Sequence, residues 1–311
     1  MLERSEKMVF DDENNQIIIP QTLREIDGGG LLEKQNPHPL DSILSFEEVG
    51  HHYFVRGIRH DALHYLSSTT FLGTFFPGFD KKKCLGYIMR GHRYVNDPDY
   101  RYYRQTEVEI LDGWKALGDK ASALGSRFHA NVEYHCNDMA VEDNSPEFQQ
   151  YLNFRMDNPE LIPFRTEMLI LHEEYRIVGS VDAIFKNTAT GKYFIVDWKR
   201  SKKVDRKNGD KGYFPLEHLK SDNLTKYSIQ LSLYRFILET VYGLEMESSA
   251  LVICHPNQKQ FIMMRTKYMK SDIEAMLQFR LLQLYKAQLV PVPDEIMNTE
   301  GLVEWDLVRD L

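Results

Sequence analysis

Two apolar segments joined by a short polar turn constrain the fold of this chain most. Residues 175–185 (YRIVGSVDAIF) and 192–198 (KYFIVDW) are rich in β-branched and aromatic residues, as strands are. The residues around NTATGK between them have the composition and length of a hairpin turn. A third strand is expected just before this hairpin, around TEMLILHEE (166–174). These segments predict the centre of a β-sheet.

Helical patterns occur before and after the hairpin, so the predicted sheet belongs to a larger domain that also contains helices. The order of elements is helical, then strand-rich, then helix, strand and helix, which predicts an α/β or α+β domain with a central mixed sheet flanked by helices. The other expected strands are at 51–57, 249–255 and 260–265. The expected helices are at 68–75 with Ser68 or Thr69 as N-cap, at 113–137, from Ser145-Pro146-Glu147 onward, at 224–242, and from Ser271, where Ser271 and Glu274 form a capping box.

Composition divides the chain into three parts. Residues 1–45 are polar, contain the flexible triplet Gly28-Gly29-Gly30, and are expected to form an N-terminal extension with little core of its own. Within this extension, QIIIP has the composition of an edge strand. Residues 46–290 are expected to form one domain with a helical N-terminal part, and residues 291–311 an irregular tail.

Several classes of protein are disfavoured by composition. The sequence has no run of eighteen apolar residues, which argues against a membrane span, and its N-terminus has neither an apolar signal core nor the low acidity of a mitochondrial presequence. The three cysteines are far apart and form no CxxC pair, so neither a zinc cluster nor a disulfide framework is indicated. We expect an intracellular protein, cytoplasmic or nuclear.

The distribution of charge is uneven. A net charge of -8 argues against a protein that coats nucleic acid non-specifically. The segment after the second hairpin strand is nevertheless strongly basic, which fits a local nucleic-acid contact and a solvated loop equally well. Its basic residues are Lys199, Arg200, Lys202, Lys203, Arg206, Lys207 and Lys211.

Acidic residues occur inside the two apolar strands. Because side chains alternate along a strand, Asp197 and Lys199 project from one face, opposite to Trp198. If the two strands pair as a hairpin, Asp182 approaches Asp197. Two neighbouring carboxylates repel and are costly to bury, and a divalent cation such as Mg²⁺ or Mn²⁺ removes that cost. The alternative is an ordinary cross-strand ion pair between Asp182 and Lys199.

Two helices carry polar residues at a spacing of four. His129 and Glu133 share one face of the first, where both side chains can reach one cation. Gln230 and Tyr234 share one face of the second and can hydrogen-bond to phosphate or hold metal ligands. Each pair is also compatible with ordinary packing of a helix on the sheet.

Taken in order, these motifs resemble the PD-(D/E)xK nuclease superfamily over about residues 50 to 265. The motifs are G-x-x-x-H, a glutamate, GxVDxxF, IVDWKxS and QxxxY, ending at His129, Glu167, Phe185, Ser201 and Tyr234. Residues 50 to 265 are similar to the RecB-type and lambda-exonuclease-like branch, in particular to mitochondrial genome maintenance exonucleases and to exonucleases of large DNA viruses. The resemblance to the viral enzymes leaves a viral source as one alternative. SSTTFLGTFF resembles a short element that precedes the catalytic core in those proteins.

The resemblance implies a restriction-endonuclease-like core and a role for each matched residue. It implies His129, Asp182 and Asp197 as metal ligands, Lys199 as the catalytic lysine, Glu167 as an acidic residue of the first core strand, and Gln230 and Tyr234 as residues that support the lysine and the DNA backbone. The implied cofactor is Mg²⁺, with Mn²⁺ able to substitute. Val181 stands where the superfamily name has proline, a departure common in this branch.

The function implied is that of a metal-dependent exonuclease acting on DNA ends in replication, repair or recombination. The alternatives are a structure-specific endonuclease of the same fold and a non-catalytic DNA-binding subunit. Aromatic and basic residues of the 81–104 stretch can stack on bases and contact phosphates, or simply pack in the core. The expected DNA contacts are Ser68, Thr70, Lys81, Lys82, Lys83, Arg90, Arg93, Arg200, Lys202 and Lys203. Polarity, strandedness and oligomeric state stay open.

Overall fold

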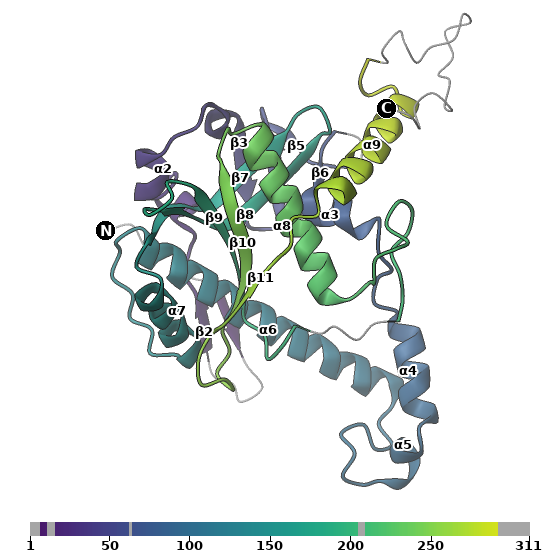
Figure 1. Ribbon diagram of the computed structural model, residues 1–311. Helices are drawn as coiled ribbons and strands as arrows, with labels where there is room; N and C mark the ends of the chain where they lie inside the picture. The colour runs from purple at the N-terminus through teal and green to yellow at the C-terminus, as the bar shows by residue number, and fades with distance from the viewer. Residues whose placement is uncertain (1–6, 11–15, 62–63, 205–208, 292–311) are drawn as a thin grey trace, which may run out of the picture.

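The structure is a computed structural model that describes residues 7–10, 16–61, 64–204 and 209–291 (Figure 1). Arg206, Lys207 and the tail from residue 292 lie outside the described residues. Among the described helices, none has the length and apolar character needed to cross a membrane.

A mixed sheet forms the centre of the fold, as predicted. Its strands are β6 (Leu66–Ser67), β7 (Leu161–His172), β8 (Ile177–Asn187), β9 (Tyr193–Lys199), β10 (Met246–Ile253) and β11 (Ile262–Arg265). The path β11-β10-β9-β8-β6 has parallel pairing at β9/β10 and β6/β8, and β7 pairs antiparallel with β8 along the other edge of β8. The predicted hairpin is present as β8 and β9.

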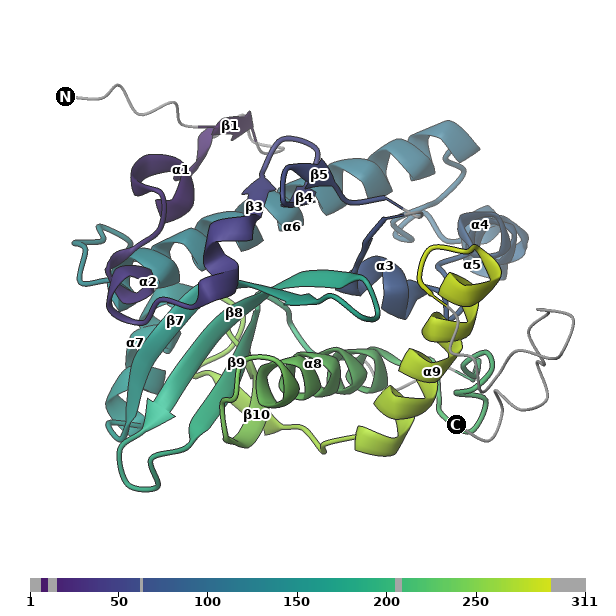
Figure 2. The same cartoon turned by 90° about the horizontal axis from the view of Figure 1, so that it is seen from above.

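Helices cover both faces of this sheet (Figure 2). They are α3 (Ser68–Gly73), α6 (Glu107–Cys136), α7 (Pro146–Asp157), α8 (Asn223–Thr240) and α9 (Lys270–Lys286). Ile195 and Leu251 belong to a core with residues of α8 and α9, whereas Val196 and Trp198 belong to a core with residues of α6 and α7. The alternation predicted for β9 is therefore confirmed. Side chains of this size contribute about 1.5–3 kcal/mol each when fully buried.

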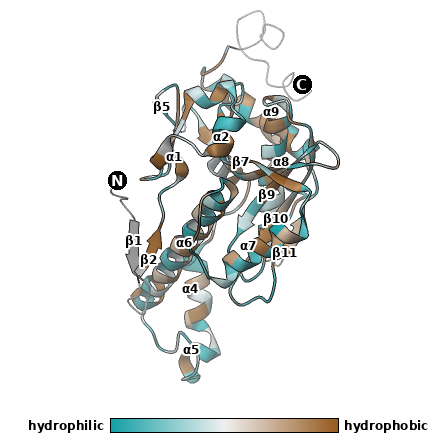
Figure 3. Ribbon diagram, turned by 90° about the vertical axis from the view of Figure 1, so that its left-hand side faces the viewer, coloured by the Kyte–Doolittle hydropathy of each residue, from teal (hydrophilic) through white to brown (hydrophobic). Residues whose placement is uncertain are grey.

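The long helix α6 begins six residues before its predicted start. Thr106 caps it in a capping box with Glu109. The apolar residues that indicated the helix in the sequence start only at Trp114. Hydrophilic and hydrophobic residues are mixed along the helix (Figure 3). At its first turns α6 carries the α4–α5 lobe (residues 79–105), which contains α4 (Lys81–Arg90) and α5 (His92–Asn96) and lies away from the sheet (Figure 1). Trp114 Nε1 donates to the Tyr102 hydroxyl at 2.8 Å and ties the lobe to α6.

Two further helix starts differ from prediction. Helix α3 is capped by Ser67, whose hydroxyl accepts from Thr70 N, rather than by Ser68 or Thr69. Helix α9 begins after Met269 without a side-chain cap, so the capping box from Ser271 is wrong. The amide of Met269 donates instead to Ser232 Oγ at 3.0 Å, which shows that a tertiary contact with α8 satisfies this helix start.

The N-terminal part packs against the sheet and α6. It contains β1 (Lys7–Phe10), β2 (Gln16–Ile19), α1 (Leu23–Asp27), α2 (Leu31–Gln35), the 3₁₀ helix η1 (Pro39–Ile43), β3 (Leu44–Glu47), β4 (His52–Val55) and β5 (Ile58–Arg59). The predicted QIII strand pairs with β1, and the strand expected at 51–57 pairs with β3 and β5. Leu32 is buried in the same core cluster as Phe128 and Val132 of α6.

Candidate metal centre

A gap along one edge of β8 locates the candidate site. On this edge, β6 pairs with Ile177 and Val178, and β9 pairs from Ala183 onward. The next pair in the β8/β9 register would join Asp182 to Asp197, but the ladder ends before it. Asp182 Oδ2 instead accepts a hydrogen bond from the Trp198 amide at 2.9 Å. The strands thus separate where the acidic residues begin.

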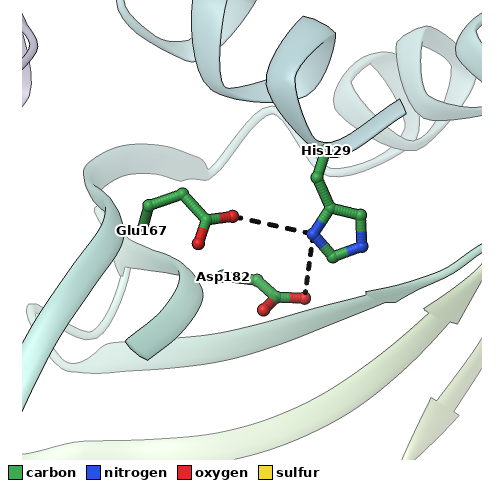
Figure 4. A group of neighbouring side chains, drawn as sticks. All are labelled: His129, Glu167 and Asp182. Atoms are coloured by element: carbon green, nitrogen blue, oxygen red, sulfur yellow. Dashed lines mark ion pairs between the residues drawn. The ribbon is translucent and has the colours of Figure 1, made fainter. Parts of the chain in front are cut away.

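Three potential metal ligands meet at this gap (Figure 4). Their donor atoms all lie within 4.8 Å of one another. His129 Nδ1 is 3.6 Å from Glu167 Oε1 and 3.6 Å from Asp182 Oδ2. These distances are too long for good hydrogen bonds, yet they suit three ligands around one cation. The three side chains come from α6, β7 and β8.

His129 is oriented by its other ring nitrogen. Its Nε2 is 3.2 Å from the Trp198 carbonyl oxygen, so an Nε2–H donates there and Nδ1 faces the two carboxylates. Burial lowers the pKa of His129, but the charges of Asp182 and Glu167 outweigh burial and raise it to about 9. The field that holds a proton on Nδ1 equally favours a cation at that position.

Glu167 has an unusual backbone conformation. Its φ is 43°, in the left-handed region, although it lies within β7. The β7/β8 register runs through Thr166–Ala183 and Met168–Val181 but not through Glu167–Asp182. Non-glycine residues adopt this conformation at a cost of about 1–3 kcal/mol and are held in it by their surroundings. The Glu167 carboxylate accepts from Ser180 Oγ at 3.2 Å and points toward His129 (Figure 4).

Asp197 and Lys199 form an ion pair beside the three ligands. Lys199 Nζ is 2.6 Å from Asp197 Oδ2, and the Asp197 side chain is 3% exposed. Burial raises the pKa of Asp182, and it raises the pKa of Asp197 to about 6 against the opposing effect of Lys199. Burial lowers the pKa of Lys199, but Asp197 and Asp182 together raise it above its usual value. Lys199 is therefore an ammonium ion.

Helix α8 supplies the polar residues predicted to support the site. Gln230 Nε2 donates to the Tyr234 hydroxyl at 2.9 Å, and that hydroxyl is 3.2 Å from Ser68 Oγ. A Cβ on Gly179 would lie 2.5 Å from Ser68 Oγ, so glycine permits this close approach. Tyr227, which the sequence had not indicated, lies with its ring centroid 4.8 Å from Lys199 Nζ.

The predicted DNA contacts lie in different environments. Thr70, Lys202 and Lys203 are exposed, as are the basic residues of the lobe, Lys81, Lys82, Lys83, Arg90 and Arg93. Ser68 is 2% exposed and bonded to Tyr234, which places its hydroxyl in the interior. The Arg200 side chain is 12% exposed and pairs with Glu147 of α7 at 2.6 Å. Ser68 and Arg200 therefore have structural partners instead of a free surface.

A cleft of about 820 Å³ separates the lobe from the start of α8. Exposed aromatic rings and lysines line it, together with a half-buried lysine and three aspartates: Phe79, Tyr87, Tyr213, Lys83, Lys211, Lys226, Asp80, Asp210 and Asp222. Lys226 Nζ donates to the Pro77 carbonyl at 3.3 Å. Because Tyr227, next in the chain, contacts Lys199, the first turns of α8 connect the cleft with the ion pair.

Glu133 lies one helical turn after His129, as its spacing predicted, but not among the three clustered ligands. It is 6% exposed, and its carboxylate accepts from Leu23 N at 3.4 Å. Burial, together with the charge of Glu167, raises its pKa to about 8. The folded state therefore holds the proton more tightly than the unfolded state does, so stability falls as the pH rises from about 5 to about 8.

We expect Glu133→Gln to stabilise the protein at pH 9 and to have little effect at pH 5. Glutamine keeps an acceptor for Leu23 N and removes the buried charge. The melting temperature should rise by about 2–4 °C for each kcal/mol relieved. Glu107→Gln, at the exposed first turn of α6, is the control. An equal shift at both pH values for Glu133→Gln would contradict the burial effect.

Comparisons with known proteins leave the family of this chain open. No protein-family profile matches it, and no curated protein matches its sequence. Among solved structures, one similar chain is described as "Crystal structure of SSO0001". The two share 14% sequence identity with a TM-score of 0.31, over 78% of this chain and 90% of the other. A similarity at this level supports no conclusion on function.

Proposed function

We propose that this protein is a metal-dependent deoxyribonuclease of the PD-(D/E)xK type, acting as an exonuclease on DNA ends. The observation that carries the proposal is the convergence of His129, Glu167 and Asp182 beside the Asp197–Lys199 pair. An ordinary ion pair would explain Asp197 and Lys199. It does not explain why three further titratable groups from three elements converge at the same break in the sheet.

The ligand set fits a divalent cation. One imidazole and two carboxylates suit Mn²⁺ well, and Mg²⁺ is bound through few protein ligands with water completing its shell. Asp197, on the next strand, faces the same gap with its charge shared by Lys199. A bound cation would supply Lewis acidity to the scissile phosphate and to the attacking water.

The residues of the chain have separate roles in this proposal. Lys199, held as an ammonium ion by Asp197, donates hydrogen bonds to a phosphate oxygen or to the attacking water and balances the charge that develops there. The ring of Tyr227 lies against the ammonium group of the lysine and helps to keep it in place. Tyr234 and Gln230 hold α8 next to the site through their hydrogen bonds to each other and to Ser68 of α3.

The cleft beside the lobe supports DNA as the substrate. Its aromatic rings can stack on bases, and its lysines can contact phosphates without regard to sequence. The exposed lysines of α4 extend this surface. An intracellular setting, cytoplasmic or nuclear, belongs to the same proposal, since Cys84, Cys136 and Cys254 are free thiols.

Cleavage of end-labelled linear DNA beside a covalently closed circle tests the proposal. With Mg²⁺ or Mn²⁺ at low salt, we expect progressive loss of the linear DNA and survival of the circle. Chelation of the cation should stop the reaction. Asp182→Asn protein, purified in parallel, controls for a contaminating nuclease. Efficient nicking of the circle would favour the endonuclease alternative, and no cleavage of either DNA would favour the non-catalytic one.

A further inference from the structure

We propose that the brace, which we define as residues 22–43, fixes Glu167 in its ligand position, with Arg24 as the positioning residue. This inference rests on the metal centre proposed above and adds the contacts that hold one of its ligands in place. The brace comprises α1, α2 and η1, which the sequence indicated only as part of a polar extension.

Four consecutive residues of β7, from Phe164 to Glu167, accept or donate hydrogen bonds outside the sheet. The Asn36 side chain donates to the Phe164 carbonyl at 3.0 Å. Asn137 links the next contact, because its Nδ2 donates to Thr166 Oγ1 at 2.9 Å while its Oδ1 accepts from Leu32 N at 2.9 Å. Between them, Arg165 points into the brace. The contacts thus run through the β7 segment that ends at Glu167.

Arg165 anchors the brace. It is 0% exposed, and its guanidinium bonds to both carboxylate oxygens of Asp41 at 3.0 and 3.2 Å and to the Asn36 carbonyl at 2.8 Å. Glu33 Oε2 lies 3.2 Å from Arg165 Nη2, while the buried Nε of Arg165 has no hydrogen-bond partner among the described residues. A buried guanidinium requires such partners, so the brace cannot leave β7 without exposing an unpaired charge.

Arg24 connects this anchor to the metal ligand. Its Nη2 lies 3.1 Å from Glu33 Oε2 and 3.4 Å from the Glu167 carbonyl oxygen. Glu33 is therefore shared by Arg24 and Arg165. The β7/β8 register skips Glu167, and the carbonyl of this residue accepts a hydrogen bond from Arg24. The strained φ of 43° and this external contact occur at the same residue.

The glycine triplet permits the close packing of the brace. A Cβ on Gly30 would lie 2.3 Å from Asn137 Oδ1, the atom that accepts from Leu32 N. Gly28 ends α1 in the left-handed conformation, with a φ of 65°. The triplet expected to be flexible therefore fits α1 and α2 tightly against α6.

Arg24→Gln tests the brace with Mn²⁺ alone as the probe, measured by titration calorimetry at pH 8. Removing a contact to a ligand-bearing residue typically costs about tenfold or more in metal affinity. Arg235→Gln is a matched control, because Arg235 likewise joins a carboxylate, Glu239 at 2.8 Å, to a backbone carbonyl, Met246 at 2.8 Å. Melting temperatures without metal report how much each change costs the fold.

We expect Arg24→Gln to weaken Mn²⁺ binding at least about tenfold relative to Arg235→Gln, at a comparable melting temperature. Glu33→Gln, which removes the shared carboxylate, should weaken binding in the same direction. Equal Mn²⁺ affinity in Arg24→Gln and Arg235→Gln would overturn the brace. Failure of the unmodified protein to bind Mn²⁺ would instead overturn the metal centre and, with it, the proposed function.

Discussion

Asp182→Asn is expected to abolish cation-dependent DNA cleavage, with a loss of at least about a thousandfold, or about 4 kcal/mol. Asparagine keeps an oxygen that can accept from the Trp198 amide, so the local backbone contact survives. The negative charge of Asp182, which lies beside His129 and would bind the cation, is lost. Single-turnover cleavage of linear DNA and Mn²⁺ calorimetry measure the two effects on one preparation.

Asp182→Asn should increase the free energy of unfolding at pH 8, although it abolishes cleavage. Because burial raises the pKa of Asp182, its carboxylate costs folding free energy at pH 8, and the neutral amide relieves part of that cost. Asp143→Asn, in the segment before α7, is the matched control for the same chemical change. A variant that is less stable but cleaves at the normal rate would reduce Asp182 to a structural residue.

Lys199→Met is expected to lose most of its cleavage rate and also to destabilise the fold at pH 8. Removing one partner of a buried pair typically costs about 3–5 kcal/mol, because the other charge is left unpaired. The Asp197 carboxylate, on a side chain that is 3% exposed, is that charge. The destabilisation should shrink as the pH is lowered to 6 and below, because Asp197 then takes up a proton. Thermal melting at several pH values and single-turnover kinetics measure the two losses.

The double variant Asp197→Asn with Lys199→Met separates chemistry from stability. With both charges removed, no unpaired charge remains, and much of the lost stability should return. The rate should not return, since the ammonium donor is absent and the gap has lost a carboxylate. Recovery of rate together with stability would show that Asp197 and Lys199 matter only as an ion pair.

The sequence predicted the sheet better than the site. Period-two alternation placed Ile195 and Trp198 on opposite faces of β9, and the turn composition predicted the β8/β9 hairpin, because both signals are local. Pairing of the two strands as a hairpin was expected to bring Asp182 close to Asp197. The structure ends the ladder at Ala183, and Asp182 binds the Trp198 amide instead.

Other parts of the site depend on partners that are distant in the chain. The spacing of His129 and Glu133 suggested a shared cation, but only His129 meets Glu167 and Asp182, because Glu133 bonds to Leu23 of the brace. Arg200, in a basic run, finds its partner Glu147 on α7. No local pattern contains these contacts, nor the positive φ of Glu167.

The length of α6 has a consequence for how this protein can diversify. The helix has 30 residues. Phe128 and Val132, in its later turns, pack in one core with residues of the sheet, while its first turns carry the α4–α5 lobe (Figure 1). Gly113 and Gly118, in the outer half, have open space around them. Insertions, deletions or new side chains in the lobe are therefore remote from the packing that sets the cation ligands. Under the proposed function, selection can change the surface of the lobe without changing the cation ligands, and grafting a lobe from another protein onto α6 becomes a practical route to altered DNA preference.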